Sequence, residues 1–350
     1  MTSNKGVVSQ LAIVLVLIFL LGFVILLGFV PLWYHFHISP KGESEIGMLV
    51  NEINTTEGVI QKLEKIARWE GENIDYIYGM PHKKLLGYEI YSINEKYKIR
   101  PTKPPYNNDP KWIAYYKVGG CGELASFFYE VAKRAGFEVR VVEDNGIDHA
   151  WVEVKLNDSW VVADPTIYWW YVNDPKNHSD WDKLWFNSKS WYKLWGFSRV
   201  VTQSKNGTIL DLTANYTRTY NVTISIDPEI QNGILKVTTW KGSEERIVFH
   251  STVNGSDNIS LSLGKRIYKF ELIEPTWYGV EKFGRRVYSI DEIEGKVVRL
   301  KIEEKRLTNG YYIFIGFLFG VIISLLAMVL AIMMRQPVMK LCEKLLRRNK

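Results

Sequence analysis

Three residues in the middle of the chain, Cys121, His149 and Asp164, carry the side chains that nucleophilic amide chemistry requires. A cysteine thiolate can attack an amide carbonyl, an imidazole can move the proton to the departing amine, and a carboxylate can hold that imidazole in one orientation. His149 follows Cys121 by 28 residues, and Asp164 follows His149 by 15. The three residue types in this order indicate a candidate thiol active site.

Local sequence signals place each of these residues at the end of a secondary-structure element. Gly119 and Gly120 open a helix at Cys121 that Gly136 ends, and the helix N-terminus would favour the thiolate. Residues 137–143, 149–156 and 160–164 are predicted to be strands. In an antiparallel hairpin Asp164 would lie opposite His149 or one pleat away, on the same face. We expect Asp164 to hold Nδ1–H of the imidazole while the other ring nitrogen faces Cys121.

Several short strings surround these residues. They are GCGELA at 120–125, AGFEVRVV at 135–142, DHAWVEV at 148–154, Trp160, and DPT at 164–166. Together they resemble the core of the transglutaminase-like superfamily over about 111–170, and the GCGE and DHAWVEV strings are most similar to its peptide N-glycanase branch. The resemblance implies a papain-like Cys-His-Asp triad acting on amides. In that triad Cys121 would be the nucleophile, His149 the general base and acid, and Asp164 the orienting residue.

The chain departs from these relatives in two respects. The paired Cys-x-x-Cys metal motifs of eukaryotic glycanases are missing, and we predict neither a metal nor a cofactor. For the oxyanion we expect the backbone N–H of Cys121 to be one donor, and Trp112 is a weaker candidate for an aromatic donor.

Tryptophan is concentrated between residues 151 and 195. One interpretation is that some of these rings form a stacking wall for a sugar or peptide. The favoured alternative is core packing and a lid over the site. The candidates for a groove wall are Trp169, Trp170, Trp181 and Trp185.

Two segments, 11–33 and 311–334, contain no charged residue over 23 and 24 positions. At about 1.5 Å per residue, helices of this length reach roughly 35 Å, enough to cross a bilayer core of about 30 Å. The first apolar run is longer than a signal-peptide core and no small-residue cleavage pattern follows it. We therefore expect two transmembrane helices.

The positive charge of the chain lies in its two flanks. Residues 1–10 carry one base and the tail at 335–350 has a balance of +5, which together account for the net charge of +6. The region between the spans is neutral, so the sequence predicts no nucleic-acid partner. Because basic flanks remain in the cytoplasm, we expect a two-pass protein of the cell membrane with both termini cytoplasmic and the main region outside.

An outward location agrees with eight Asn-x-Ser/Thr sequons, all between the two spans. These glycosylation candidates are Asn54, Asn157, Asn177, Asn206, Asn215, Asn221, Asn254 and Asn258. In this topology Cys121 and Cys342 lie on opposite sides of the membrane and cannot form a disulfide.

The predicted fold class is α+β. Residues 43–200 would form the papain-like transglutaminase domain, with its core at 111–170, and 215–305 alternate apolar and polar residues as in a small β-sandwich. Within the first domain, residues 43–80 read as mostly helical, with Thr56 as a possible cap, and 100–110 as a proline-rich connection.

These patterns favour a membrane-anchored thiol enzyme that transfers or hydrolyses an amide of a protein, peptide or glycopeptide at the cell surface. One alternative is a catalytically inert module that binds a partner or organises an envelope assembly. A second is a glycan-releasing amidase. Small residues recur on the second span, which predicts close helix contact with the first span or with another copy of the chain; they are Gly316, Gly320 and Ser324.

Overall fold

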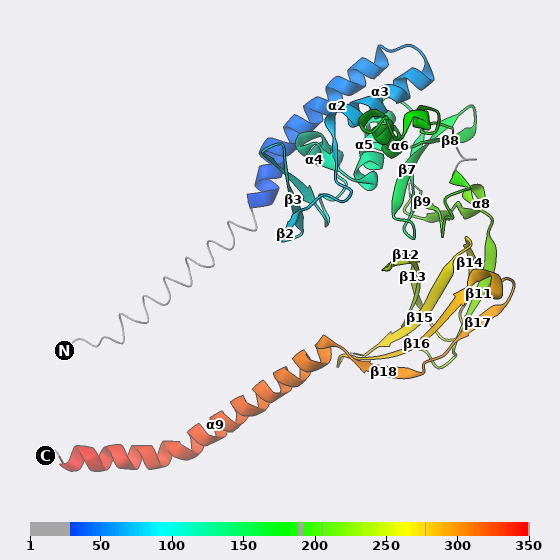
Figure 1. The fold of residues 1–350 in the computed structure, drawn as a ribbon. Helices are drawn as coiled ribbons and strands as arrows, with labels where there is room; N and C mark the ends of the chain where they lie inside the picture. The colour runs from blue at the N-terminus through cyan, green and yellow to red at the C-terminus, as the bar shows by residue number, and fades with distance from the viewer. Residues whose placement is uncertain (1–28, 188–191, 205, 277, 349–350) are drawn as a thin grey trace. The chain divides into compact units, whose positions relative to one another are not determined.

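A computed structural model describes residues 29–187, 192–204, 206–276 and 278–348, with side chains described as far as residue 329. The chain divides into two compact units, Met1–Arg218 and Thr219–Lys350. Figure 1 shows their helices and strands in chain order. The fold class is α+β, because the first unit combines helices with antiparallel strands and the second consists of further sheets and one long helix.

The main sheet of the first unit is antiparallel, with the strand order β10-β9-β6-β7-β8. Its strands are β6 (Val139–Asp144), β7 (His149–Leu156), β8 (Ser159–Ala163), β9 (Val201–Gln203) and β10 (Ile209–Asp211). The first three strands are those that the sequence predicted. β7 is buried from His149 to Val154 because it lies between β6 and β8 and is covered by helix α5 (Cys121–Arg134).

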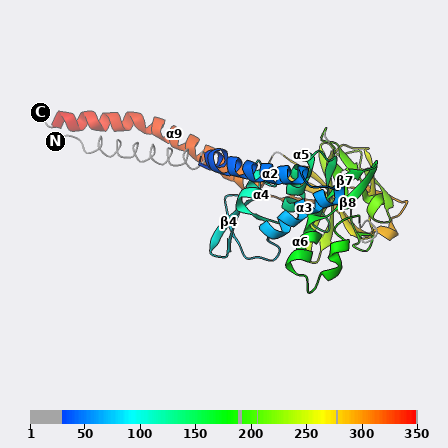
Figure 2. The same cartoon turned by 90° about the horizontal axis from the view of Figure 1, so that it is seen from above.

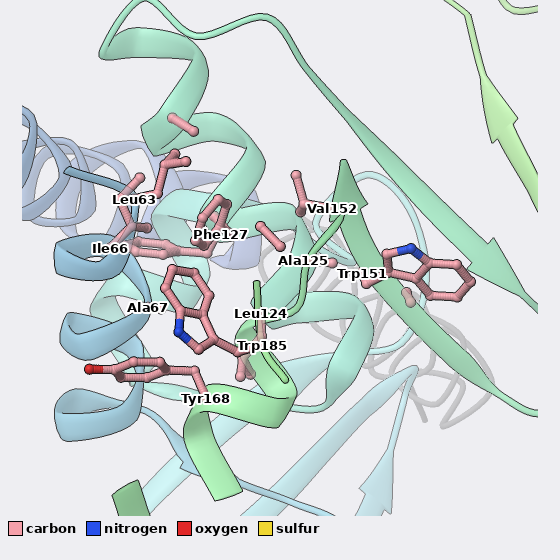
Figure 3. Packing of buried hydrophobic residues seen from close by; sticks show 14 of the residues in the cluster. Leu63, Ile66, Ala67, Leu124, Ala125, Phe127, Trp151, Val152, Tyr168 and Trp185 are labelled. Carbon is pink, nitrogen blue, oxygen red and sulfur yellow. The ribbon is translucent and has the colours of Figure 1, made fainter. Parts of the chain in front are cut away.

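Helices α3 (Val59–Asn73), α5 and α6 (Pro165–Asn173) pack together beside this sheet. Figure 3 shows Leu63 and Ile66 of α3 facing Phe127 of α5, with Trp185 nearby. All of these side chains belong to one apolar core. This core holds the start of α5 and the start of α6 against the same strand, β7.

The segment that the sequence predicted as one mostly helical stretch consists of two helices, α2 (Ser39–Asn54) and α3, followed by strand β1 (Asp75–Tyr76). Thr56 was wrong as the helix cap. Its hydroxyl donates to the carbonyl of Glu52 in the last turn of α2, so Thr56 contacts the end of that helix. The residue that precedes α3 is Gly58, with a φ of 81°.

Two small sheets that the sequence analysis did not predict lie next to the α5 N-terminus. β1 pairs in parallel with β5 (Val118–Gly119), which places Tyr76 opposite Gly119. A three-stranded antiparallel sheet has the order β2-β3-β4. Its strands are β2 (Lys83–Leu85), β3 (Tyr88–Ile93) and β4 (Lys96–Pro101).

The described chain begins as a helix at residues 29–33, continues as a π-helical turn, η1 (Tyr34–Ile38), and runs directly into α2. Figures 1 and 2 both show α2 lying along α4 (Pro110–Tyr116). The two helices can approach this closely because Gly42 has no side chain. A Cβ at this position would lie only 2.2 Å from the Lys111 carbonyl oxygen. Most of the first predicted span, 11–33, lies outside the described residues.

Two sheets of the second unit share one apolar core. One has the order β14-β11-β17, and the other has the order β13-β12-β15-β16-β18. Their strands are β11 (Tyr220–Ile226), β12 (Gly233–Lys241), β13 (Glu244–Val253), β14 (Asn258–Leu263), β15 (Ile267–Pro275), β16 (Val280–Ser289), β17 (Val297–Leu300) and β18 (Glu304–Leu307). Short helices complete the two units, namely η2 (Ser179–Lys183), α8 (Thr213–Tyr216) and η3 (Ile290–Glu292).

The second unit ends in one helix, α9 (Asn309–Arg348). Its part Asn309–Val329 has a mean hydropathy of 2.6 and no buried share, so it is long and apolar enough for a membrane span. It begins two residues before the span predicted at 311–334. Ser324 donates its hydroxyl to the Gly320 carbonyl of the same helix, and nothing lies within 4 Å of a Cβ placed on Gly316 or Gly320.

Candidate active site

Cys121 is the first residue of α5, directly after the turn formed by Gly119 and Gly120. Glu123 caps this helix, because its Oε2 accepts a hydrogen bond of 2.9 Å from the Gly120 N–H. A Cβ on Gly119 would lie 2.6 Å from Cβ of Glu123, so this turn requires glycine. The sulfur of Cys121 is partly exposed and donates to the Asp148 carbonyl at 3.7 Å. The predicted nucleophile therefore occupies the positive end of a helix dipole and remains accessible.

His149 and Asp164 meet across the hairpin of β7 and β8. Val152 lies opposite Ala163, which leaves Asp164 one pleat from His149 on the same face, as the sequence predicted. The imidazole Nε2 lies 2.7 Å from Asp164 Oδ2. The expected use of Nδ1 was wrong, because Nε2 is the ring nitrogen that faces the carboxylate. Nδ1 is consequently the ring nitrogen left for Cys121.

Asp164 is held in place from several sides. It precedes α6, and its Oδ1 accepts hydrogen bonds from the Thr166 and Ile167 N–H groups at 2.8 and 3.2 Å. Its Oδ2 accepts the short hydrogen bond from the Tyr192 hydroxyl as well as the bond from His149. With both oxygens engaged and the side chain fully buried, the carboxylate has little freedom to turn.

The charge around His149 favours the imidazolium form. Burial, the largest influence, lowers the pKa of His149, but the Asp164 carboxylate and then the Cys121 sulfur outweigh it and raise the pKa from 6.5 to about 10. The imidazole therefore keeps its proton at neutral pH. The Cys121 sulfur lies 3.7 Å from the carbonyl oxygen of Asp148, the residue directly before His149, so it is close to the start of the strand that carries the imidazole.

Aromatic residues that the sequence analysis did not select surround the imidazole. Trp151 stacks on His149 with 5.6 Å between ring centroids, and Trp195 lies at 5.2 Å. Tyr192 is buried, and burial followed by the Asp164 charge raises its pKa, so its hydroxyl remains a donor to Asp164. Tyr192 lies 28 residues after Asp164 in sequence, and no local pattern links the two.

Trp112 is not an oxyanion donor, contrary to the sequence expectation. Its side chain is 4% exposed, and its single N–H donates to the Ile99 carbonyl at 2.7 Å. Tyr76 is an alternative aromatic donor that the sequence analysis did not select. It lies opposite Gly119 in the β1–β5 pair, and burial and the charge of Cys121 raise its pKa, so its hydroxyl keeps its proton.

The four tryptophans proposed for a groove wall occupy different positions. Trp169 and Trp170 flank Tyr76 with ring centroids at 5.2 and 5.8 Å, so both lie near the Cys121 turn. Trp181 contacts the His178 ring at 4.2 Å. Trp185 is 5% exposed and packs in the core, where its carbonyl accepts the Asp164 N–H.

Two further features bear on ligands. Between α3 and α6 lies a cleft of about 460 Å³ with acidic and aromatic walls, lined by Glu64, Arg68, Glu72, Tyr168, Tyr171 and Trp185 among others. Among the described residues no group of three His, Cys, Asp or Glu side chains is arranged to hold a metal ion.

All eight sequon asparagines are exposed, which leaves them accessible to modification.

Comparison with known proteins agrees with this site. Residues 48–165 match the model of the transglutaminase-like superfamily. The chain is 27% identical over 144 residues to peptide-N(4)-(N-acetyl-beta-glucosaminyl)asparagine amidase of Arabidopsis thaliana, covering 39% of this chain and 18% of that protein. A solved structure of a proposed cysteine protease from Cytophaga hutchinsonii aligns with a TM-score of 0.25 at 15% identity, over 37% of this chain and 39% of that one, which supports no conclusion here. Residues 48–165 thus belong to the transglutaminase-like superfamily and are distantly related to a peptide N-glycanase.

Proposed function

We propose that this chain is a membrane-anchored thiol enzyme that hydrolyses or transfers an amide of a protein, peptide or glycopeptide outside the cell. Cys121 would be its nucleophile, His149 its general base and acid, and Asp164 the residue that positions His149. One observation carries the proposal: His149 Nε2 lies 2.7 Å from Asp164 Oδ2, while the Cys121 sulfur lies 3.7 Å from the carbonyl oxygen of Asp148, the residue directly before His149.

The first half of the reaction forms a thioester. The Cys121 sulfur bonds to the amide carbon, and the carbonyl π electrons move to oxygen, where the Cys121 backbone N–H and the Tyr76 hydroxyl would stabilise the negative charge. The His149 imidazolium then gives its Nδ1 proton to the amide nitrogen. The carbon–nitrogen bond breaks, the amine leaves, and the acyl group stays on sulfur.

The second half releases the acyl group. Neutral His149 takes a proton from water or from a second amine, which attacks the thioester carbon and expels the Cys121 thiolate. Water produces a carboxylic acid, and an amine produces a new amide. Hydrolase and transferase share every residue of this mechanism and differ only in the acceptor.

Glycan release from an asparagine side chain is the second candidate function. It is the same chemistry applied to the amide that joins a sugar to asparagine, and the likeness to the Arabidopsis thaliana amidase favours it. Trp169 and Trp170 beside Tyr76 could stack on sugar rings. The competing non-enzymatic function is an inert module that binds a partner at the cell surface.

We extend the proposal to the membrane. The exposed apolar part of α9 supports one span at the C-terminal end, and the predicted segment 11–33 would supply the other, with both termini cytoplasmic. The face of α9 that contains Gly316, Gly320 and Ser324 would contact the first span or a second copy of the chain. The exposed sequons agree with a location outside the cell.

Alkylation of Cys121 tests the thiol enzyme directly. In the full chain with Cys342→Ser, iodoacetamide should label Cys121 rapidly near neutral pH, and His149→Ala should abolish this rapid labelling. His178→Ala is the matched control, because His178 also pairs with an aspartate, Asp174, at 3.2 Å. Labelling that requires unfolding, or that His149→Ala leaves unchanged, would support the inert module instead.

A further inference from the structure

The turn between β2 and β3 exposes two adjacent leucines. Leu85 is 58% exposed and Leu86 is 81% exposed, and Leu86 adopts a φ of 48°, in the left-handed region that a leucine rarely occupies. Lys83 and Lys84 precede them and are exposed. Apolar side chains at the tip of a hairpin, next to several lysines, fit the boundary between lipid headgroups and acyl chains.

A chain of aromatic contacts ties this hairpin to the helix at the start of the described chain. Tyr88, at the start of β3, lies 5.9 Å from Trp112, and the Trp112 ring lies 6.1 Å from Tyr34. Tyr106 contacts both Tyr34, at 4.5 Å, and Trp112, at 5.4 Å. Two aromatic rings, those of Tyr88 and Trp112, therefore connect the hairpin to Tyr34, the residue that directly follows the predicted span 11–33.

Figures 1 and 2 agree with these contacts, since both show the three-stranded sheet beside the N-terminal end of the described helix. The helix passes from residues 29–33 through η1 into α2 without a linker, so this end of the unit cannot move far from the end of the span. Clusters of tyrosine and tryptophan are typical of the membrane interface.

We propose that the Leu85–Leu86 tip enters the headgroup region of the bilayer that holds the span 11–33, with Lys83, Lys84 and Lys103 facing anionic headgroups. Lys84 also lies 3.7 Å from Glu89, but its side chain is 75% exposed and can reach a headgroup. This inference rests on the membrane anchoring in the proposed function. The Lys103 side chain passes beside Gly87, so the third lysine lies at the same tip.

The same sheet is bonded to the helix that carries the candidate nucleophile. Arg100 of β4 binds Glu89 of β3 at 3.0 Å and Glu123 of α5 at 2.6 Å, and Glu123 holds the Gly120 N–H. A hairpin seated in the headgroups would therefore hold Cys121 at a constant height above the bilayer. The amides within reach would be those in the membrane-proximal segments of neighbouring proteins.

Depth-dependent quenching tests the proposal with the full chain. Leu86→Cys, in a Cys121→Ser and Cys342→Ser background, is labelled with an environment-sensitive dye and reconstituted into vesicles of phosphatidylcholine and phosphatidylglycerol. Lipids with a nitroxide high on the acyl chain should quench this dye several-fold more than a dye at Leu194→Cys, which is equally exposed at 81%. Replacing Lys83 and Lys84 by glutamine should weaken the quenching.

Flotation of the same vesicles distinguishes failure of the hairpin proposal from failure of the membrane anchoring. If the protein floats with the lipid after alkaline washing but both dyes are quenched equally, the hairpin proposal is overturned and the membrane anchoring stands. If the protein does not float, the anchoring is wrong and the hairpin proposal falls with it. Preferential quenching at residue 86 in protein that floats supports both.

Discussion

Arg100 and Glu123 form two parallel hydrogen bonds, from Nε to Oε1 at 2.6 Å and from Nη2 to Oε2 at 3.2 Å. Arg100 lies on β4 and Glu123 in the first turn of α5, so this pair joins the three-stranded sheet to the Cys121 helix. The second contact of Arg100, with Glu89, brings another carboxylate into the network. An Arg–carboxylate pair with this fork geometry restrains both partners more strongly than a single contact does.

Arg100→Ala should destabilise the first unit by about 2–4 kcal/mol, because it removes the guanidinium that pairs with the buried Glu123 carboxylate and leaves Glu89 with only longer cation contacts, such as that to Lys84 at 3.7 Å. Arg68→Ala is the control, since Arg68 pairs with Glu64 at 2.6 Å but is 56% exposed, and such a pair contributes about 1 kcal/mol or less. Urea unfolding followed by tryptophan fluorescence measures both. Equal losses for the two variants would mean that the Arg100 network does not stabilise the fold.

Asp164→Asn should leave the fold intact, because asparagine can still accept the two backbone hydrogen bonds at the start of α6. Turnover should fall by about 10³- to 10⁴-fold, as expected when an aspartate that orients a catalytic histidine is neutralised. The half-maximal pH of Cys121 alkylation should also rise, since the imidazolium loses the charge that raises its pKa. Unchanged turnover and alkylation would remove Asp164 from the mechanism.

Tyr76→Phe should lower kcat by about 10²-fold or more with little change in KM, because the hydroxyl would act only on the developing oxyanion. Cys121 alkylation should stay near the wild-type rate, since no oxyanion forms in that reaction. Tyr88→Phe, on β3 of the separate three-stranded sheet, is the control. A parallel loss of alkylation in Tyr76→Phe would show that the tyrosine acts on the thiol and not on the oxyanion.

Glu70 lies fully buried on α3, and neither of its carboxyl oxygens has a hydrogen-bond partner among the described residues. Burial, and then the charge of Asp164, raise the pKa of Glu70 well above 4.5. The folded protein therefore keeps Glu70 protonated while the unfolded chain ionises it. Its contribution to stability falls as the pH rises from about 4.5 toward the folded pKa.

Glu70→Gln removes this pH dependence, because the amide does not titrate. The variant should match the wild type near pH 4 and be more stable by about 1–3 kcal/mol at neutral pH. Glu72→Gln, at an exposed position of the same helix, should change stability little at either pH. Unfolding free energies measured at both pH values check the prediction, and identical curves for wild type and Glu70→Gln would contradict it.

The sequence alone determined the parts of the site that depend on local structure. The glycine turn before Cys121 and the apolar spacing after it define α5, and the short β7–β8 turn sets a register in which His149 and Asp164 share a face. Helix starts and hairpin registers follow from residues close together in the chain. The family resemblance at these residues agrees with the superfamily match over 48–165.

Only the tertiary structure decided which distant residues join them. The ring nitrogen that faces Asp164, the hydroxyl that Tyr192 donates and the position of Tyr76 beside Gly119 all depend on segments that meet through packing. Trp112 was misassigned for the same reason, since its partner, Ile99, lies on a strand that no sequence pattern revealed. Hydrophobic periodicity predicts which face of an element is buried, but the element that covers this face is chosen by the packing of the whole unit.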